Sequence, residues 1–258
     1  MPQAVLLTVA DDTATVTLNR PDKMNALNAE TWRALRQVLA TVEAEDAVRC
    51  IVLRGAGGHF AAGADLAEFR EQRWTTDQAT AYGRMMVETL HALRDCRHPT
   101  IAAIEGNCVG AGLEVAAMCD LRVAAQSAKF GVPIQKIGVT MPYPEIADLV
   151  TLLGRATVLE MLLEGGIYDA DWALAKGLVT RLCKPAELEP AVAALARRIA
   201  AGSPVSHRNH KKMTRRCQLP APIRAEEICE AYAACETADY REGISAFLDK
   251  RKPNFTGT

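Results

Sequence analysis

The chain has 258 residues, of which 49% are hydrophobic and 24% are charged, and its formal net charge at pH 7 is -1. This composition is typical of a water-soluble globular protein and gives no overall positive charge that would attract nucleic acid or an anionic membrane. Residues 1–20 have no signal-peptide pattern and no apolar stretch reaches the roughly 18 residues of a membrane helix, so we expect a cytoplasmic protein with neither of these partners.

Predicted strands and helices alternate in the first half of the chain. Apolar runs bounded by turn residues predict strands at 4–9, 13–19, 50–54, 100–105 and 121–125. Asn28 is predicted to cap a helix, because apolar residues recur after it at helical spacing. Further helix is predicted over most of 66–93 and at 113–119. This alternation indicates an α/β fold.

From Pro144 onward the chain is predicted to be almost entirely helical. The predicted helices cover 144–153, 155–164, 169–176, 186–201 and 221–249. Gly154 and Gly177 suit helix C-termini, and Asp169 suits an N-cap. No low-complexity linker divides the chain, so the last helices are expected to pack on the core or on another subunit.

Two glycine-rich turns, at 61–65 and 106–112, each follow a predicted strand. The second turn opens directly into a helix whose first turn carries Glu114. The first N–H groups of a helix lack intrahelical partners, and the helix dipole makes that end positive. Such a turn can hold a developing oxyanion while a nearby carboxylate moves a proton. Val115 occupies the place of the third glycine in a dinucleotide fingerprint, which argues against hydride transfer.

Taken together, these segments closely resemble the crotonase (enoyl-CoA hydratase/isomerase) superfamily. The matching segments run in family order at 18–27, 60–66, 103–106, 110–114, 119–120, 173–179 and 250–255. The resemblance implies a crotonase-like spiral core of repeated ββα units over residues 1–195. It also implies a helical region at 196–258 that covers the site and makes a homotrimer or a dimer of trimers. The substrate is then an acyl-CoA, with no permanently bound cofactor.

The resemblance also implies roles for individual residues. The backbone N–H groups of Ala64 and Ala111 would hold the thioester oxygen, and Glu114 would transfer the proton. Contacts with the coenzyme A portion would come from Lys23, Ala62, Ala64, Asp65, Leu66 and Lys250, the last reaching a phosphate from a neighbouring subunit. No metal is expected, because His207 and His210 have no companion ligands at metal-binding spacing.

The chain departs from the hydratase pattern at the second catalytic glutamate, where Pro133 is followed by Ile134. One carboxylate is enough for double-bond isomerisation, so isomerase or weak hydratase chemistry is favoured. The Pro-Tyr pair at 142–143, within the segment 138–145, and the Ile-Glu-Gly at 104–106 together resemble the methylmalonyl-CoA decarboxylase branch, which makes decarboxylation of a malonyl-type thioester the alternative. In this segment Tyr143 could hydrogen-bond a substrate carboxylate or carbonyl, and Glu145 could replace the missing acid.

A function of another class also stays open. The loss of one catalytic glutamate is compatible with a degenerate family member that binds acyl-CoA or RNA as a scaffold. The basic run 208–216 contains no aromatic residue on which a base could stack, so it is interpreted as an exposed helix face. The sequence does not define the acyl group.

Overall fold

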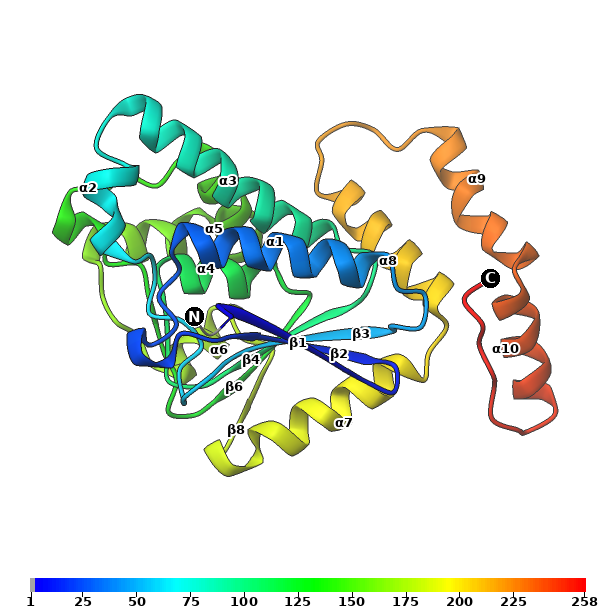
Figure 1. The fold of residues 1–258 in the computed structure, drawn as a ribbon. Helices are drawn as coiled ribbons and strands as arrows, with labels where there is room; N and C mark the ends of the chain where they lie inside the picture. The colour runs from blue at the N-terminus through cyan, green and yellow to red at the C-terminus, as the bar shows by residue number, and fades with distance from the viewer. Residues whose placement is uncertain (1–2) are drawn as a thin grey trace.

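The structure, a computed structural model, describes residues 3–258 and has the predicted α/β architecture (Figure 1). Its main sheet has the strand order β1-β2-β3-β4-β6-β8, in which β1 is antiparallel to β2 and all other neighbours are parallel. These strands are β1 (Val5–Ala10), β2 (Thr13–Leu18), β3 (Cys50–Gly55), β4 (Thr100–Ile104), β6 (Leu121–Ala125) and β8 (Arg181–Cys183). A second, parallel sheet pairs β5 (Asn107–Val109) with β7 (Lys129–Gly131).

Ten α-helices accompany the sheets in the described part of the chain. They are α1 (Ala29–Glu43), α2 (Phe69–Gln72), α3 (Thr76–Asp95), α4 (Ala111–Met118), α5 (Tyr143–Glu164), α6 (Ala170–Ala175), α7 (Leu188–Ala200), α8 (Pro204–Cys217), α9 (Ala225–Ala233) and α10 (Ala238–Leu248). Short 3-10 turns occur at Pro21–Lys23, Leu66–Glu68, Ile134–Ile137, Pro185–Glu187 and Ala234–Glu236.

Helices cover both faces of the main sheet. In β3, Ile51 and Leu53 point into the larger core with α1, α3 and α4, whereas Cys50 and Val52 pack against α7. Figure 1 shows α1 and α3 on one side of the sheet and α7 on the other. Side chains alternate between the faces of a strand, so a strand buried on both faces is apolar throughout. This explains the continuous apolar run from which the strand at 50–54 is predicted.

Capping residues set the ends of several helices as predicted. Asn28 accepts a hydrogen bond from the N–H of Thr31 at the start of α1, and Asp169 does the same for α6. Gly154 has a φ of 76° and interrupts α5, and Gly177, with a φ of 77°, follows α6. A positive φ carries little cost for glycine, which has no Cβ.

Several predicted elements were wrong in extent. The helix predicted over most of 66–93 is broken before Thr75, whose side chain caps α3 in a capping box with Gln78. The single helix predicted at 221–249 is two helices, because a 3-10 turn follows α9 and Thr237 caps α10. The three-residue strands β5, β7 and β8 were not predicted. Helix α8 contains the basic run 208–216, which agrees with its interpretation as part of a helix.

Helix α8 joins the C-terminal helices to the core. The Nζ atom of Lys211 donates to Asp120 at 2.6 Å and to the carbonyl of His98 at 2.8 Å. Figure 1 shows α9 and α10 on the side of the molecule opposite α2 and α5. Within residues 3–258, no helix combines the length and apolar character that crossing a membrane requires.

Candidate active site

Two backbone segments that follow β3 and β4 run side by side. Ala61 and Cys108 form a parallel bridge, in which the N–H of Val109 donates to the carbonyl of Ala61 at 3.0 Å. Beyond the bridge the two segments stay close, because a Cβ added to Gly63 would lie 3.3 Å from the carbonyl oxygen of Val109, and Ala64 and Ala111 each come directly after a glycine of this contact. The glycine-rich turns at 61–65 and 106–112 therefore lie in direct contact in the structure.

Glycines permit this close approach. Gly63 and Gly110 have φ values of 112° and 52°, and a Cβ added to Gly110 would lie 3.6 Å from the Cα of Gly63. At Gly112 an added Cβ would lie only 2.5 Å from the carbonyl oxygen of Ala61. The second turn can thus approach the first only because position 112 has no side chain.

The N–H groups of Ala64 and Ala111 are free at this point. Neither donates a hydrogen bond to any group within residues 3–258, yet both residues line one cavity. Ala111 is the first residue of α4, and the preceding Gly110 offers no side-chain cap. Free N–H groups at the positive end of a helix are suited to bind an oxyanion.

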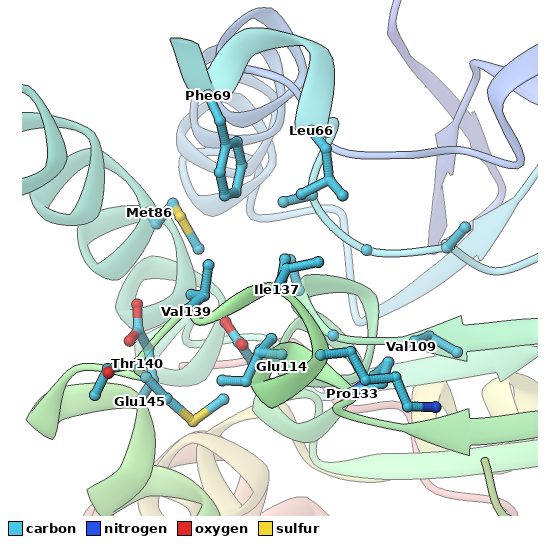
Figure 2. Close-up of a pocket in the computed structure, with 18 of the residues that line it drawn as sticks. Leu66, Phe69, Met86, Val109, Glu114, Pro133, Ile137, Val139, Thr140 and Glu145 are labelled. Carbon is cyan, nitrogen blue, oxygen red and sulfur yellow. The ribbon is translucent and has the colours of Figure 1, made fainter. Parts of the chain in front are cut away.

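The cavity, which Ala64 and Ala111 help to line, has a volume of about 340 Å³. Figure 2 shows it in close-up. Its wall is mainly apolar and includes Leu66, Phe69, Met86, Val109, Pro133, Ile134, Ile137, Val139, Met141 and Ile167. Ionisable groups at the cavity come from Arg73, Glu114, Lys136 and Glu145. A mainly apolar cavity with a few convergent polar groups has the general character of a small-molecule site.

Two carboxylates reach the cavity from different helices. Glu114 lies in the first turn of α4 and is 7% exposed, and Glu145 lies in the first turn of α5 and is 4% exposed. Each has an Oε2 atom that is buried without a hydrogen-bond partner among residues 3–258. Figure 2 shows both carboxylates at the same cavity. Unpartnered buried oxygens of this kind are available to a substrate or a water molecule.

Burial makes both groups weaker acids than free glutamate. Desolvation, with a further contribution from the charge of Glu145, raises the pKa of Glu114 to about 8 against a smaller opposing effect of Arg73. Desolvation also raises the pKa of Glu145 to about 7, opposed by Arg73 and reinforced by Asp148. Near neutral pH such a pair can hold one proton and accept another.

The loop before α1 supports the first glycine turn. Leu27 donates its N–H to the carbonyl of Gly63 at 2.7 Å and accepts from the N–H of Asp65 at 2.9 Å. The buried side chain of Asn25 donates to the carbonyls of Ala56 and His59 at 2.8 and 2.7 Å. The segment 18–27 therefore holds the backbone of the turn without contributing a side chain to the cavity.

Only some of the remaining predicted site residues line the cavity. Ala62 and Leu66 line the cavity, as do Ala64 and Ala111. Asp65 does not line it; its carboxylate accepts from the N–H of Ala67 and pairs with Arg20 at 2.8 Å.

Three other predicted residues do not line the cavity. Lys23 and Lys250 are exposed, and no described residue of 196–258 lines the cavity within this chain. Tyr143 is 90% exposed, so the predicted hydrogen bond from its hydroxyl to a substrate is not supported by the position of this side chain.

Sequence reasoning missed Arg73. Its guanidinium carbon lies 4.5 Å from the ring centre of Phe69 and 5.3 Å from that of Tyr82, and the residue lines the cavity. The signal that could have found it is the four-residue spacing between Phe69 and Arg73, which brings the cation that ends a short helix back to an aromatic ring at its start.

Comparison with known proteins defines the family. The sequence profile of the family Enoyl-CoA hydratase/isomerase matches residues 9–258, and the chain belongs to this family. It is 32% identical to a short-chain-enoyl-CoA hydratase of Clostridium acetobutylicum over 96% of this chain and 95% of the relative. It is 33% identical to a crotonyl-CoA hydratase of Syntrophomonas wolfei over 97% of both chains.

Solved structures agree with this result. The crystal structure of an enoyl-CoA hydratase/carnithine racemase from Magnetospirillum magneticum has a TM-score of 0.97 and 48% identity, and the match covers 99% of this chain and 96% of the other. The enoyl-CoA hydratase of Bacillus anthracis has a TM-score of 0.91 and 28% identity over 99% and 100% of the two chains. The crotonase fold predicted from the sequence is therefore confirmed, and the protein is an acyl-CoA enzyme of this family.

Proposed function

We propose that this enzyme adds water reversibly to the double bond of a 2-enoyl-CoA thioester. The observation that carries the proposal is that Glu114 and Glu145 are both buried in the cavity beside the free N–H groups of Ala64 and Ala111. Hydration needs one group to activate water and another to protonate the α-carbon. Ile134 removes the usual second glutamate, and Glu145 supplies a carboxylate from another helix.

The different pKa values of Glu114 and Glu145 determine which carboxyl group accepts a proton and which donates one. Glu145, with the lower pKa of about 7, takes a proton from water while the water oxygen bonds to the β-carbon. Glu114, with a pKa of about 8, holds a proton and delivers it to the α-carbon. Between these events the thioester oxygen carries negative charge, which the N–H groups of Ala64 and Ala111 stabilise by roughly 3–4 kcal/mol each.

The coenzyme A portion is proposed to leave the cavity along Ala62 and Leu66, near the exposed Lys23. In an oligomer, Lys250 of a neighbouring subunit would meet a phosphate. We propose residues 1–195 as the catalytic core and residues 196–258 as the region that forms a trimer or a dimer of trimers. Large apolar side chains exposed in this region support the assignment: Leu219, Ile223, Ile228, Tyr232, Tyr240, Ile244, Phe247 and Leu248.

Three parallel assays test the proposed reaction: hydration of crotonyl-CoA, isomerisation of a 3-enoyl-CoA and decarboxylation of methylmalonyl-CoA. We expect hydration to be the fastest. Glu114→Gln and Glu145→Gln should each lower kcat for hydration by about 10²–10⁴-fold, because each removes one proton-transfer group. Glu88→Gln, at an exposed position on α3, is the matched control. Hydration that survives Glu145→Gln at the wild-type rate would contradict the two-carboxylate mechanism.

The alternatives have less support. Isomerisation by Glu114 alone would leave the second unpartnered carboxylate, Glu145, without a role. For decarboxylation, Tyr143 would be expected at the cavity, and it lies in solvent.

For an RNA-binding scaffold, free cations would be expected on α8. All five Lys and Arg side chains of 208–216 instead have partners within the chain: Arg208 with Gly257, Lys211 with Asp120, Lys212 with Glu230, Arg215 with Asp95 and Arg216 with Glu227.

A further inference from the structure

Two cations of the cavity wall, Arg73 and Lys136, have no anionic partner within residues 3–258, and only Arg73 is half-buried, because Lys136 is exposed. Arg73 lies half-buried between α2 and α3, and its guanidinium forms neither an ion pair nor a hydrogen bond with any group in residues 3–258. Glu114 and Glu145 line the same cavity, and the positive charge of Arg73 lowers the pKa of both side chains. Neither carboxylate is within ion-pair distance of Arg73. A guanidinium has five N–H donors, and here all of them are left for solvent or a ligand.

The aromatic rings beside Arg73 hold its guanidinium at the wall. Phe69 and Tyr82 lie on α2 and α3, with ring centres 4.5 and 5.3 Å from the guanidinium carbon. Tyr82 is itself buried and is tied to Glu68, so this platform is fixed before a ligand arrives. Two such contacts reduce the conformational freedom that a long side chain would lose on binding an anion.

The apolar surroundings of Arg73 favour a ligand that brings an anionic group to its guanidinium. Phe69, which contacts the guanidinium, belongs to an apolar part of the wall, and Figure 2 shows Leu66 and Met86 on the same side of the cavity as Phe69. A plain hydrocarbon chain in the cavity would remove water from the guanidinium and give it no acceptor in return, which is unfavourable. A carboxylate would accept two parallel hydrogen bonds from the guanidinium.

We propose that Arg73 binds a second carboxylate at the far end of the acyl chain, so that the preferred substrates are 2-enoyl-CoA thioesters of dicarboxylic acids. The inference rests on the proposed function and specifies the substrate class of the same site. A positively charged acyl group is disfavoured for the same reason, because the aromatic faces that would attract it already hold a cation.

The test compares thioesters that differ only at the chain end. Hydration of trans-2-hexenoyl-CoA is measured beside hydration of 5-carboxypent-2-enoyl-CoA, in which a carboxylate replaces the terminal methyl group. We expect the wild-type enzyme to have a kcat/KM about tenfold or more higher on the carboxylate substrate. Arg73→Leu should lower the ratio of the two kcat/KM values by about 10–100-fold, and Arg73→Lys should lower it less, because lysine keeps the charge but loses the planar fork.

Arg70→Leu is the matched control, since Arg70 is an exposed arginine of α2 that does not line the cavity. A ratio of the two kcat/KM values that stays unchanged after Arg73→Leu would overturn the inference. If both kcat/KM values fell equally, Arg73 would serve the two glutamates or a coenzyme A phosphate instead.

Inhibition of the wild-type enzyme gives a second test that needs no variant. Glutaryl-CoA and pentanoyl-CoA have chains of equal length that end in a carboxylate and a methyl group. We expect glutaryl-CoA to bind about tenfold more tightly, and equal inhibition constants would contradict the inference. If the enzyme hydrates hexenoyl-CoA without discriminating at the chain end, only this inference fails. If it hydrates neither thioester, the proposed function fails, and the dissociation constants of glutaryl-CoA and pentanoyl-CoA, measured by calorimetry, still decide the question of the carboxylate.

Discussion

Glu114 and Glu145 each experience two opposing effects on their charge. Both lie in the first turn of a helix, where the dipole favours the ionised form by roughly 0.3–1 kcal/mol. Burial acts in the other direction, and each unit of pKa shift corresponds to about 1.4 kcal/mol. The pKa of Glu114 rises from 4.5 to about 8 and that of Glu145 to about 7, so desolvation dominates over the dipole at both positions.

These two pKa values predict the pH dependence of the reaction. Glu145 must be ionised to accept a proton from water, and Glu114 must be protonated to donate one. We therefore expect kcat/KM for hydration to rise as pH increases through about 7 and to fall above about 8, with a narrow maximum between. Initial rates from pH 5.5 to 9.5 measure this profile. A flat profile between pH 6 and 9 would show that the two carboxylates do not exchange protons with the substrate.

The same shift predicts a cost in stability. Between pH 4.5 and about 8 the unfolded chain loses the proton of Glu114 while the folded protein keeps it, so the free energy of unfolding falls as pH rises through this window. Glu114→Gln removes this effect. We expect the variant to match the wild type near pH 4.5 and to be more stable at pH 8 by roughly 1–3 kcal/mol. Thermal melts at both pH values, with Glu88→Gln as control, test the sign; a variant less stable than the wild type at pH 8 would contradict it.

At the scale of elements, the site depends on how closely two turns approach. Gly112→Ala would place a Cβ 2.5 Å from the carbonyl oxygen of Ala61 and push the two segments apart. We expect a loss of about 1–3 kcal/mol in the free energy of unfolding and a fall in kcat of at least about 10²-fold, because the two N–H groups proposed to bind the thioester oxygen, those of Ala64 and Ala111, would be moved apart.

Gly83→Ala is the matched control for this substitution. Gly83 lies within α3, and its added Cβ would meet no atom within 4 Å. This change should stabilise the protein by roughly 0.5–1 kcal/mol without loss of activity. If Gly112→Ala behaves like Gly83→Ala, the approach of the two turns is not critical for catalysis.

The glycine turns and Glu114 could be predicted from the sequence, because a strand, a turn and a helix that are adjacent in the chain define that part of the site. Glu145 and Arg73 could not be assigned in this way. Glu145 is separated from Glu114 by 30 residues, and its burial depends on where α5 packs, which local periodicity does not define. The strands β5, β7 and β8 have three residues each, too few to show an alternating pattern, and their pairing comes from distant parts of the chain.

At the scale of the whole molecule, the C-terminal helices expose more apolar surface than a lone chain would be expected to carry. Tyr232 and Phe247 on α9 and α10 are 74% and 82% exposed. Large exposed apolar patches mark protein–protein contacts, so we expect an oligomer, and the resemblance to the crotonase superfamily predicts three or six chains. Light scattering after gel filtration measures this number.

Substitution of Phe247 tests whether the C-terminal helices form the contact. Phe247→Glu should shift the population toward monomers, because it would bury a charge in the interface. Trp74→Glu places the same charge at an exposed aromatic residue outside the C-terminal region and should leave the assembly unchanged. A monomeric wild-type protein, or a Phe247→Glu variant that stays fully assembled, would contradict the assignment of 196–258 as the oligomerisation region.

The central claim is that two backbone N–H groups and two carboxylates act on one thioester. A crystal structure with the unreactive substrate analogue butyryl-CoA tests it most directly. We predict a thioester oxygen about 2.7–3.2 Å from the nitrogens of both Ala64 and Ala111, with the carboxylates of Glu114 and Glu145 beside the α- and β-carbons. A thioester oxygen out of hydrogen-bond range of either nitrogen, or a Glu145 carboxylate turned away from the acyl chain, would contradict it.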